Sequence, residues 1–213
     1  MNNTDFKSLF GNKFNLDKDG LFRPCELIAL PGAELEVIDD GPICTVRLAS
    51  YGDQLLYADR RFLSDQPANQ PKMPQAAEIL ARLDGAMGLP YIWGGNYGGG
   101  ISEMLEYYPP PKKLSELERA SWTFAGVDCS GLLYEACNGL TPRNSKQLLQ
   151  YGKEVSDYQP LDLIVWDGHV VIVYDEQTTI ESRLGYGVIK TPLAGRLDEI
   201  RSHQTEFSIR RFI

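Results

Sequence analysis

The feature that most constrains the fold of this chain is a cysteine placed where a helix is expected to begin. The tetrapeptide Asp-Cys-Ser-Gly at 128–131 is followed by apolar residues at the spacing of a core-facing helix, namely Leu132, Leu133, Ala136 and Cys137. Cys129 therefore falls in the first turn, with Asp128 as a suitable N-cap. Free amides and the positive end of the helix dipole favour a thiolate there. The pattern predicts a nucleophile, against the alternative of a small buried apolar residue.

A histidine at a predicted hairpin corner could supply the matching base. Two apolar runs typical of strands, 161–166 and 169–174, flank Asp167-Gly168, and such a dipeptide is a strong signal for a tight hairpin. His169 opens the second run. A histidine at the start of a strand is usually a rim residue, but together with Cys129 it predicts a thiolate–imidazolium pair.

The remaining histidine and the cysteine of the next helical turns carry weaker signals. The chain has only two histidines, and the second, His203, lies in a polar run and is predicted to be solvated surface. Cys137 lies among apolar residues and is predicted to be part of the core.

Four short motifs occur in a fixed order between residues 76 and 213. They are Pro-Tyr-Ile-Trp-Gly-Gly at 90–95, Gly-Val-Asp-Cys-Ser-Gly-Leu at 126–132, Asp-Leu-Ile-Val at 162–165 and His-Val-Val-Ile-Val at 169–173. In this order they resemble the NlpC-type family of cell-wall cysteine peptidases, which have a papain-like fold. The resemblance implies hydrolysis of the γ-D-glutamyl-diaminopimelate bond of peptidoglycan peptides, with Cys129 as nucleophile and His169 as general base. It also implies substrate-binding roles for Tyr91, Trp93, Asp128, Ser130 and Gly168.

The third catalytic position departs from the family pattern. It is usually His, Asn or Gln, whereas counting along the chain from His169 selects Glu181. Antiparallel pairing of 178–183 with 169–174 puts Glu181 on the same face as His169 and diagonal to it. A carboxylate there would orient the imidazole and stabilise its cation. The alternative is that Glu181 pairs with Arg183 or faces solvent, since the turn register could differ by one residue.

A long segment, residues 96–127, separates the motif at 90–95 from the nucleophile and is a second departure from the family. It contains Gly98-Gly99-Gly100, three consecutive prolines at 109–111 and an amphipathic stretch at 114–122. Loops of this length inside a compact domain are usually functional or disordered. The insertion is therefore expected either at the rim of the cleft or as a surface excursion.

The chain is expected to have two domains and an α+β fold. Residues 64–75 contain three prolines among polar residues and read as a linker. Four short β-type runs precede it, at 25–30, 34–38, 43–49 and 54–58, so residues 1–63 are expected to form a small all-β barrel. Such a barrel is similar to the bacterial SH3-like modules that often precede this peptidase domain. Residues 76–213 are then the papain-like peptidase domain, with helices at 76–87 and 143–151 and a final strand within 206–213.

Composition limits the partners and the cell compartment. A net charge of −8 argues against nucleic acid and anionic membranes as partners, and no apolar run approaches the length needed for membrane insertion. Histidine and cysteine spacing forms no ligand cluster, so neither a metal nor another cofactor is expected. The start at 1–5 lacks the features of a signal peptide, and the four cysteines lack C-x-x-C spacing, so the cytoplasm is the expected location.

Together with these features, the family resemblance implies a cysteine peptidase acting on free L-Ala-γ-D-Glu-diaminopimelate peptides during cell-wall recycling. A barrel that closes one end of the cleft, with Asp128 and another carboxylate from the barrel, would receive the free α-ammonium of the peptide. The alternatives are an endopeptidase for intact peptidoglycan, an amidase or acyltransferase on the same fold, and a non-catalytic module that binds peptidoglycan or protein. The presence of both Cys129 and His169 favours an enzyme. The sequence makes no prediction about the oligomeric state.

Overall fold

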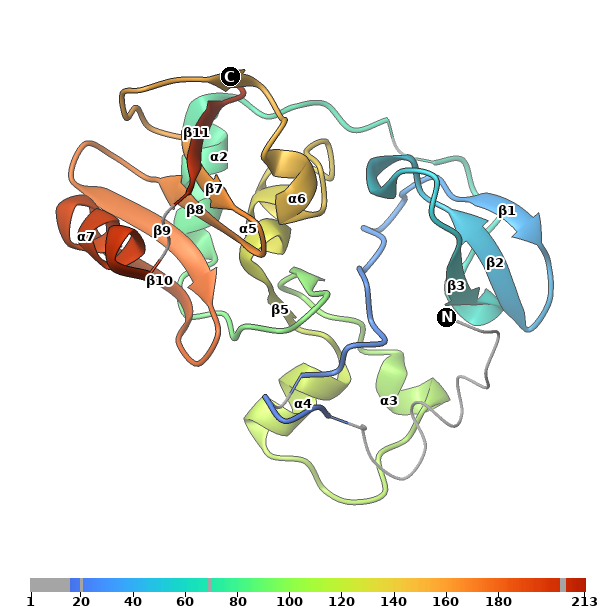
Figure 1. Cartoon of the computed structure of the whole chain (residues 1–213). Coiled ribbons are helices and arrows are strands. Elements are labelled where there is room, and N and C mark those ends of the chain that lie inside the picture. Colours follow the sequence, from blue (N-terminus) through green and yellow to red (C-terminus); the bar gives the residue numbers. More distant parts are fainter. Residues whose placement is uncertain (1–15, 20, 69, 204–205) are drawn as a thin grey trace.

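The computed structural model describes residues 16–19, 21–68, 70–203 and 206–213. Residues 1–5, on which the prediction about a signal peptide rests, and the first part of the predicted 1–63 domain lie outside this range. A larger sheet with its helices occupies one side of the molecule, and a smaller sheet occupies the other, with the insertion below and between them (Figure 1).

The larger sheet has six strands in the order β10-β9-β8-β7-β11-β6, and all of its neighbouring strands run antiparallel. Its strands are β6 (Lys153–Glu154), β7 (Leu163–Trp166), β8 (His169–Val173), β9 (Thr178–Arg183), β10 (Gly187–Pro192) and β11 (Ser208–Arg211). Its helices are α2 (Ala76–Gly85), α5 (Cys129–Ala136), α6 (Ser145–Leu148) and α7 (Leu193–His203). The predicted hairpin at Asp167-Gly168 is confirmed, because Trp166 pairs with His169 across it.

The apolar strands of this sheet are buried on both faces. Val170 and Ile172 of β8 belong to the core cluster that also holds residues of α2 and α5. Val171 and Val173, which point to the opposite face, pack in a second cluster with Leu197 and other residues of α7. Alternate side chains of a strand point to opposite faces, so a continuous apolar run such as that of β8 requires a cover on each side.

The smaller sheet contains β1 (Glu36–Asp39), β2 (Ile43–Arg47) and β3 (Leu56–Asp59) in sequential antiparallel order. It is an open three-stranded sheet and not the closed barrel expected from four strands. The run at 25–30 is not a strand, because the amide and carbonyl of Ile28 are both bonded to the side chain of Asn96, at 2.8 and 2.6 Å. A backbone whose polar groups are engaged in this way cannot pair with a neighbouring strand at that residue.

The insertion packs against the N-terminal segment. It contains β4 (Asn96–Tyr97), α3 (Met104–Tyr107), α4 (Glu116–Trp122) and β5 (Gly126–Val127), and β4 pairs with β5 so that its two ends meet. Its apolar side chains form a separate small core with the N-terminal segment, made by Phe22, Ile28, Ile92, Met104, Tyr108, Trp122 and Phe124. The insertion is thus a packed connector between the two parts of the molecule and not an isolated surface excursion.

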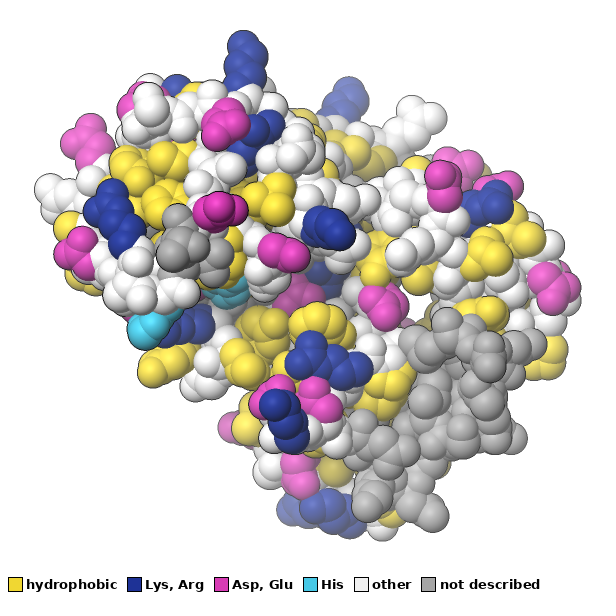
Figure 2. All heavy atoms as spheres, in the orientation of Figure 1, with side chains coloured by type: hydrophobic (Ala, Val, Ile, Leu, Met, Phe, Trp, Pro, Cys, Tyr) yellow, Lys and Arg dark blue, Asp and Glu magenta, His cyan; other side chains and the backbone are white. Residues whose placement is uncertain are grey.

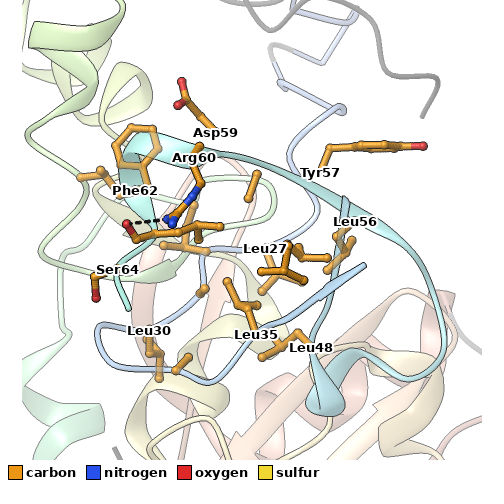
Figure 3. A pocket seen from close by; sticks show the side chains of 18 of the residues that line it. Leu27, Leu30, Leu35, Leu48, Leu56, Tyr57, Asp59, Arg60, Phe62 and Ser64 are labelled. Carbon is orange, nitrogen blue, oxygen red and sulfur yellow. Dashed lines mark hydrogen bonds between the residues drawn. The ribbon is translucent and has the colours of Figure 1, made fainter. Parts of the chain in front are cut away.

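A cavity of about 800 Å³ lies between the N-terminal part and the insertion. Leucine side chains from the N-terminal segment and the small sheet, including Leu27, Leu35 and Leu56, surround it (Figure 3). Neither Cys129 nor His169 is among its lining residues. The cavity is therefore separate from the predicted catalytic residues.

Among the residues that the structure describes, no helix has the length and apolar character needed to cross a membrane. On the face shown in Figure 2, acidic and basic side chains are interspersed, without a broad basic patch.

We predict that the hydroxyl of Tyr108 fastens the insertion to the small sheet. It donates a hydrogen bond to Asp59, which is 4% exposed and also accepts bonds from Arg61. Tyr108→Phe should lower the free energy of unfolding by about 1–3 kcal/mol, because a buried carboxylate loses a donor. Tyr107→Phe is the control, since the ring of Tyr107 meets Phe62 edge to face and lies against the guanidinium of Arg61. Urea denaturation measures both, and equal stability of the two variants would refute the role of the Tyr108 hydroxyl.

Candidate active site

Cys129 lies at the first position of α5, as the sequence predicts. Asp128 caps the helix, with its Oδ1 accepting a hydrogen bond from the amide of Gly131 at 2.7 Å, and the amide of Asp128 donates to the carbonyl of Gly95 at 2.8 Å. Gly131 must be glycine because a Cβ there would lie 2.0 Å from that same carbonyl. The ribbon formed by β4 and β5 therefore holds the start of α5 in place. Amides in the first turn of a helix have no partner within it, and the amide of Cys129 is one of them.

The hairpin of β7 and β8 brings His169 to Cys129. The Sγ atom of Cys129 lies 4.0 Å from the carbonyl oxygen of Gly168, and the thiol is close enough to His169 to raise the pKa of the imidazole. Nε2 of His169 lies 2.7 Å from Oε2 of Glu181 on β9, which leaves Nδ1 as the ring nitrogen for the thiol. The three residues predicted to be catalytic are thus neighbours, in the order cysteine, histidine, glutamate.

The charges of this cluster favour an imidazolium. Burial lowers the pKa of His169, but hydrogen bonds and charge interactions with Cys129 and Glu181 outweigh it and raise the pKa to about 9. Burial raises the pKa of the Glu181 carboxyl, but its bonds to His169 and Arg196 hold that pKa below the ordinary value. At neutral pH the site therefore contains a cation beside Cys129 and an anion behind it, which is the charge pattern that supports a thiolate.

Glu181 has a partner that the sequence did not reveal. Arg196 of α7 donates from Nε to Oε1 at 2.6 Å and from its terminal nitrogen to Oε2 at 2.8 Å. Arg183, the partner considered from the sequence, instead pairs with Glu199. The spacing of Leu193, Leu197 and Ile200, which are buried on α7, was the available signal for this helix.

Asp128 and Ser130 are engaged by a second residue that sequence reasoning missed, Arg143. The side chain of Arg143 is 2% exposed, and its two terminal nitrogens bond Oδ1 and Oδ2 of Asp128 at 2.9 and 2.6 Å. It also donates to Oγ of Ser130 at 2.9 Å and, through Nε, to Asn96 at 3.1 Å. No local pattern predicted this contact, because Arg143 lies in a polar stretch before α6.

These contacts correct the expectation that Asp128 offers an acidic wall to a substrate amine. Its Oδ1 accepts from Gly131, Ser130 and Arg143, and its Oδ2 accepts from Gly94 and Arg143. A carboxylate whose charge is balanced and whose oxygens are occupied in this way has little capacity for a further cation. Ser130 is 4% exposed and bonded to the same guanidinium, so it too supports the helix start.

The other predicted substrate-binding residues surround Cys129 in different ways. Tyr91 is half-buried, and its pKa is raised by burial and by the nearby charges of Cys129 and Asp128. The carbonyl of Gly168 faces the thiol, and a Cβ on Gly168 would meet nothing within 4 Å. Trp93 contacts the N-terminal segment instead, because the guanidinium of Arg23 lies 4.1 Å from the centre of its ring. Tyr91 and Gly168 therefore remain candidates for substrate contact, and Trp93 joins the two parts of the molecule.

The remaining titratable residues do not form a metal site within the described part of the chain. No group of three or more His, Cys, Asp or Glu side chains there could hold a metal ion. Cys137 is fully buried in the core, and burial raises the pKa of its thiol to about 12. His203 is exposed at the end of α7.

The chain matches no protein-family model and no curated protein, but it resembles several solved structures. An NlpC/P60 family protein from Bacillus cereus aligns with a TM-score of 0.45 and 22% identity, over 84% of this chain and 53% of that one. A hypothetical invasion protein of Mycobacterium tuberculosis aligns with a TM-score of 0.44 and 21% identity, over 86% of this chain and 96% of its own. RipD of the same organism aligns with a TM-score of 0.45 and 20% identity, over 66% of this chain and 99% of its own. It is described as a non-catalytic NlpC/p60 domain protein adapted to peptidoglycan binding.

The chain thus spans about half the length of the Bacillus cereus protein. Because these identities and TM-scores are low, the chemistry of the site is inferred from its own residues.

We predict that Arg143→Met destabilises the protein by about 3–5 kcal/mol, because it leaves the buried carboxylate of Asp128 without a counter-ion. The double variant Asp128→Asn/Arg143→Met removes both charges, keeps a residue that can cap α5, and should recover part of this loss. Chemical denaturation of the wild type and both variants measures the effect. A double variant as unstable as Arg143→Met would show that the unpaired charge is not the cause.

Proposed function

We propose that this chain is a cysteine peptidase of the NlpC/P60 type, with a papain-like catalytic domain that hydrolyses an amide next to D-glutamate. The observation that carries the proposal is the cluster in which Cys129 meets His169 and His169 meets Glu181 at 2.7 Å. A nucleophile bonded to a base, with the base oriented by a third group, is the arrangement required for covalent acyl transfer.

In the first half of the reaction, the thiolate of Cys129 attacks the γ-carbonyl carbon of the D-glutamyl residue. The amide of Cys129 at the helix start can donate to the oxyanion that forms. The C–N bond then breaks, and the imidazolium of His169 gives its proton to the departing amine of the diamino acid. A thioester on Cys129 and a neutral imidazole remain.

In the second half, a water molecule attacks the thioester carbonyl and His169 accepts its proton. The C–S bond breaks, which releases the carboxylic acid and restores the thiolate–imidazolium pair. Glu181 stays ionised throughout, holds Nε2 of His169 and stabilises the cation whenever it forms. The net change is hydrolysis of one amide by one water.

The proposed substrate is a free L-Ala-γ-D-Glu-diaminopimelate peptide. Because Arg143 bonds both carboxylate oxygens of Asp128, we assign recognition of the peptide's α-ammonium to Glu26. Glu26 follows Cys25 in the segment that packs on Gly94. Glu26 is exposed and accepts a hydrogen bond from Tyr51 at 2.7 Å, and it has no basic partner among the described ion pairs. A carboxylate that is ordered but lacks a counter-ion is suited to an ammonium group.

The N-terminal part would then be a specificity module. We propose that β1–β3 and the segment before them correspond to a reduced SH3-like domain, with 1–63, 64–75 and 76–213 as the domain, the linker and the peptidase. Its contacts with the catalytic half, through Ile28 and Asn96, fix it beside the start of α5. All four cysteines are free, which suits the reducing cytoplasm, where recycled peptides are available.

The catalytic proposal predicts graded losses of activity. Cys129→Ala and His169→Ala should abolish hydrolysis of the tripeptide while leaving the fold intact. Glu181→Gln should lower kcat by about 10²-fold or more, because a neutral amide supports the imidazolium less well. Purified variants are compared by mass spectrometry of the products, with circular dichroism as the folding control. Hydrolysis retained by Cys129→Ala would exclude this mechanism, and a wild type that binds peptidoglycan without turnover would indicate a binding module.

The substrate proposal predicts discrimination by the free amine. A charge-assisted hydrogen bond of about 1.5–3 kcal/mol gives about 10- to 200-fold preference for the free tripeptide over the muramoyl tripeptide. Glu26→Gln should remove most of this preference, whereas Glu36→Gln, on the exposed strand β1, should not. Rates are measured for both peptides at equal concentration. Equal rates in the wild type, or faster cleavage of intact sacculi, would identify a wall endopeptidase instead.

A further inference from the structure

A line of alternating charges runs from the catalytic histidine to the surface. Behind His169 lies Glu181, which is 0% exposed, and behind Glu181 lies Arg196, which is 7% exposed. Arg196 continues to Glu199 on the same helix at 3.0 Å, and Glu199 pairs with Arg183 at the surface. The ring of Trp166 covers this line, with its centre 5.0 Å from that of His169 and 6.0 Å from the guanidinium of Arg196.

We propose that Arg196 is a positioning residue for the reaction, which fixes the carboxylate of Glu181 and thereby sets the pH range in which His169 is an imidazolium. The inference rests on the proposed thiolate–imidazolium chemistry, but it concerns a residue outside the predicted catalytic set. Arg196 acts only through Glu181 and contacts neither the thiol nor the imidazole in any described hydrogen bond.

The geometry of Glu181 requires such a partner. A fully buried carboxylate is costly unless it is paired and hydrogen-bonded. His169 alone would engage only Oε2 of Glu181, because the described bond to Oε1 comes from Arg196. The two bonds from Arg196 occupy both oxygens of Glu181 and leave Oε2 directed at Nε2 of His169. Arg196 therefore holds the orientation of Glu181 and offsets part of its negative charge.

The direction of each electrostatic effect follows from the groups that face the pair. Cys129 faces His169 from α5, and Tyr91 lies within electrostatic reach of Cys129. Arg183, two residues after Glu181 on β9, and Glu199 on α7 complete the charged groups around Arg196. Removing the positive charge of Arg196 should raise the pKa of His169 further, whereas removing the negative charge of Glu199 should lower it.

The test is a pH titration of the imidazole of His169 by NMR, which needs no substrate. The chain has only two histidines, so His203→Gln assigns the signals. Arg196→Met should move the midpoint of His169 from about 9 upward by about one pH unit, as expected for loss of a charge this close. Glu199→Gln should move it downward by less, because Glu199 is 36% exposed and its charge is partly screened.

Arg196→Lys and Arg201→Met complete the set. Arg196→Lys keeps the charge, so its midpoint should stay within a few tenths of the wild type, although kcat on the tripeptide should fall because an ammonium cannot bridge both oxygens as a guanidinium does. Arg201→Met is the matched control on α7, where Arg201 is 58% exposed, and should change neither quantity.

Opposite shifts in Arg196→Met and Glu199→Gln would support the proposal, since general loosening of the structure would not produce opposite signs. An unchanged or downward midpoint in a folded Arg196→Met would overturn it. If that variant does not fold, Glu199→Gln decides, and an unchanged or upward midpoint there would overturn it. Failure of the tripeptide to be cleaved by the wild type would refute the substrate proposal but would leave these titrations interpretable.

Discussion

The buried ion pair between Arg143 and Asp128 joins the parts of the structure on which the candidate active site depends. Asp128 caps the helix that carries Cys129, and Arg143 holds that carboxylate with two bonds of 2.9 and 2.6 Å. Through its Nε atom the same guanidinium reaches Asn96, whose side chain bonds both polar groups of Ile28. One desolvated cation thus connects the start of the catalytic helix, the base of the insertion and the N-terminal segment.

This connection explains why the N-terminal part is an open sheet and the insertion is ordered. The segment at 25–30 has the residues of a strand, but Asn96 uses the backbone groups of Ile28, and the carbonyl of Cys25 lies against Gly94. Tyr108 then closes the other side by its bond to the buried Asp59. Apolar burial supplies most of the stability in such assemblies, but these polar contacts decide which surfaces meet, because a mismatched partner would leave a buried polar group unsatisfied.

Local patterns predicted the features that depend on few residues close in sequence. The helix start at Cys129, the hairpin at Asp167-Gly168 and the position of Glu181 beside His169 follow from capping, turn chemistry and strand alternation. Arg143 and Arg196 could not be found in this way, since each meets its carboxylate 15 residues away through tertiary packing. The sequence shows the charge of Asp128 but not its neutralisation by Arg143. Because of this neutralisation, Asp128 is poorly suited to bind a substrate amine.

The two buried arginines perform different tasks at the same site. Arg143 bonds both oxygens of Asp128, so that carboxylate is held in place as the cap of α5. Arg196 leaves Oε2 of Glu181 in contact with His169, so the charge of Glu181 remains available to the imidazole. A cysteine nucleophile needs both kinds of support, since the thiolate depends on a rigid helix start and the imidazolium depends on an anion behind it. In this fold each requirement is met by a carboxylate held from behind by an arginine. The remaining partners differ, because Asp128 meets Ser130 and backbone amides whereas Oε2 of Glu181 also meets His169.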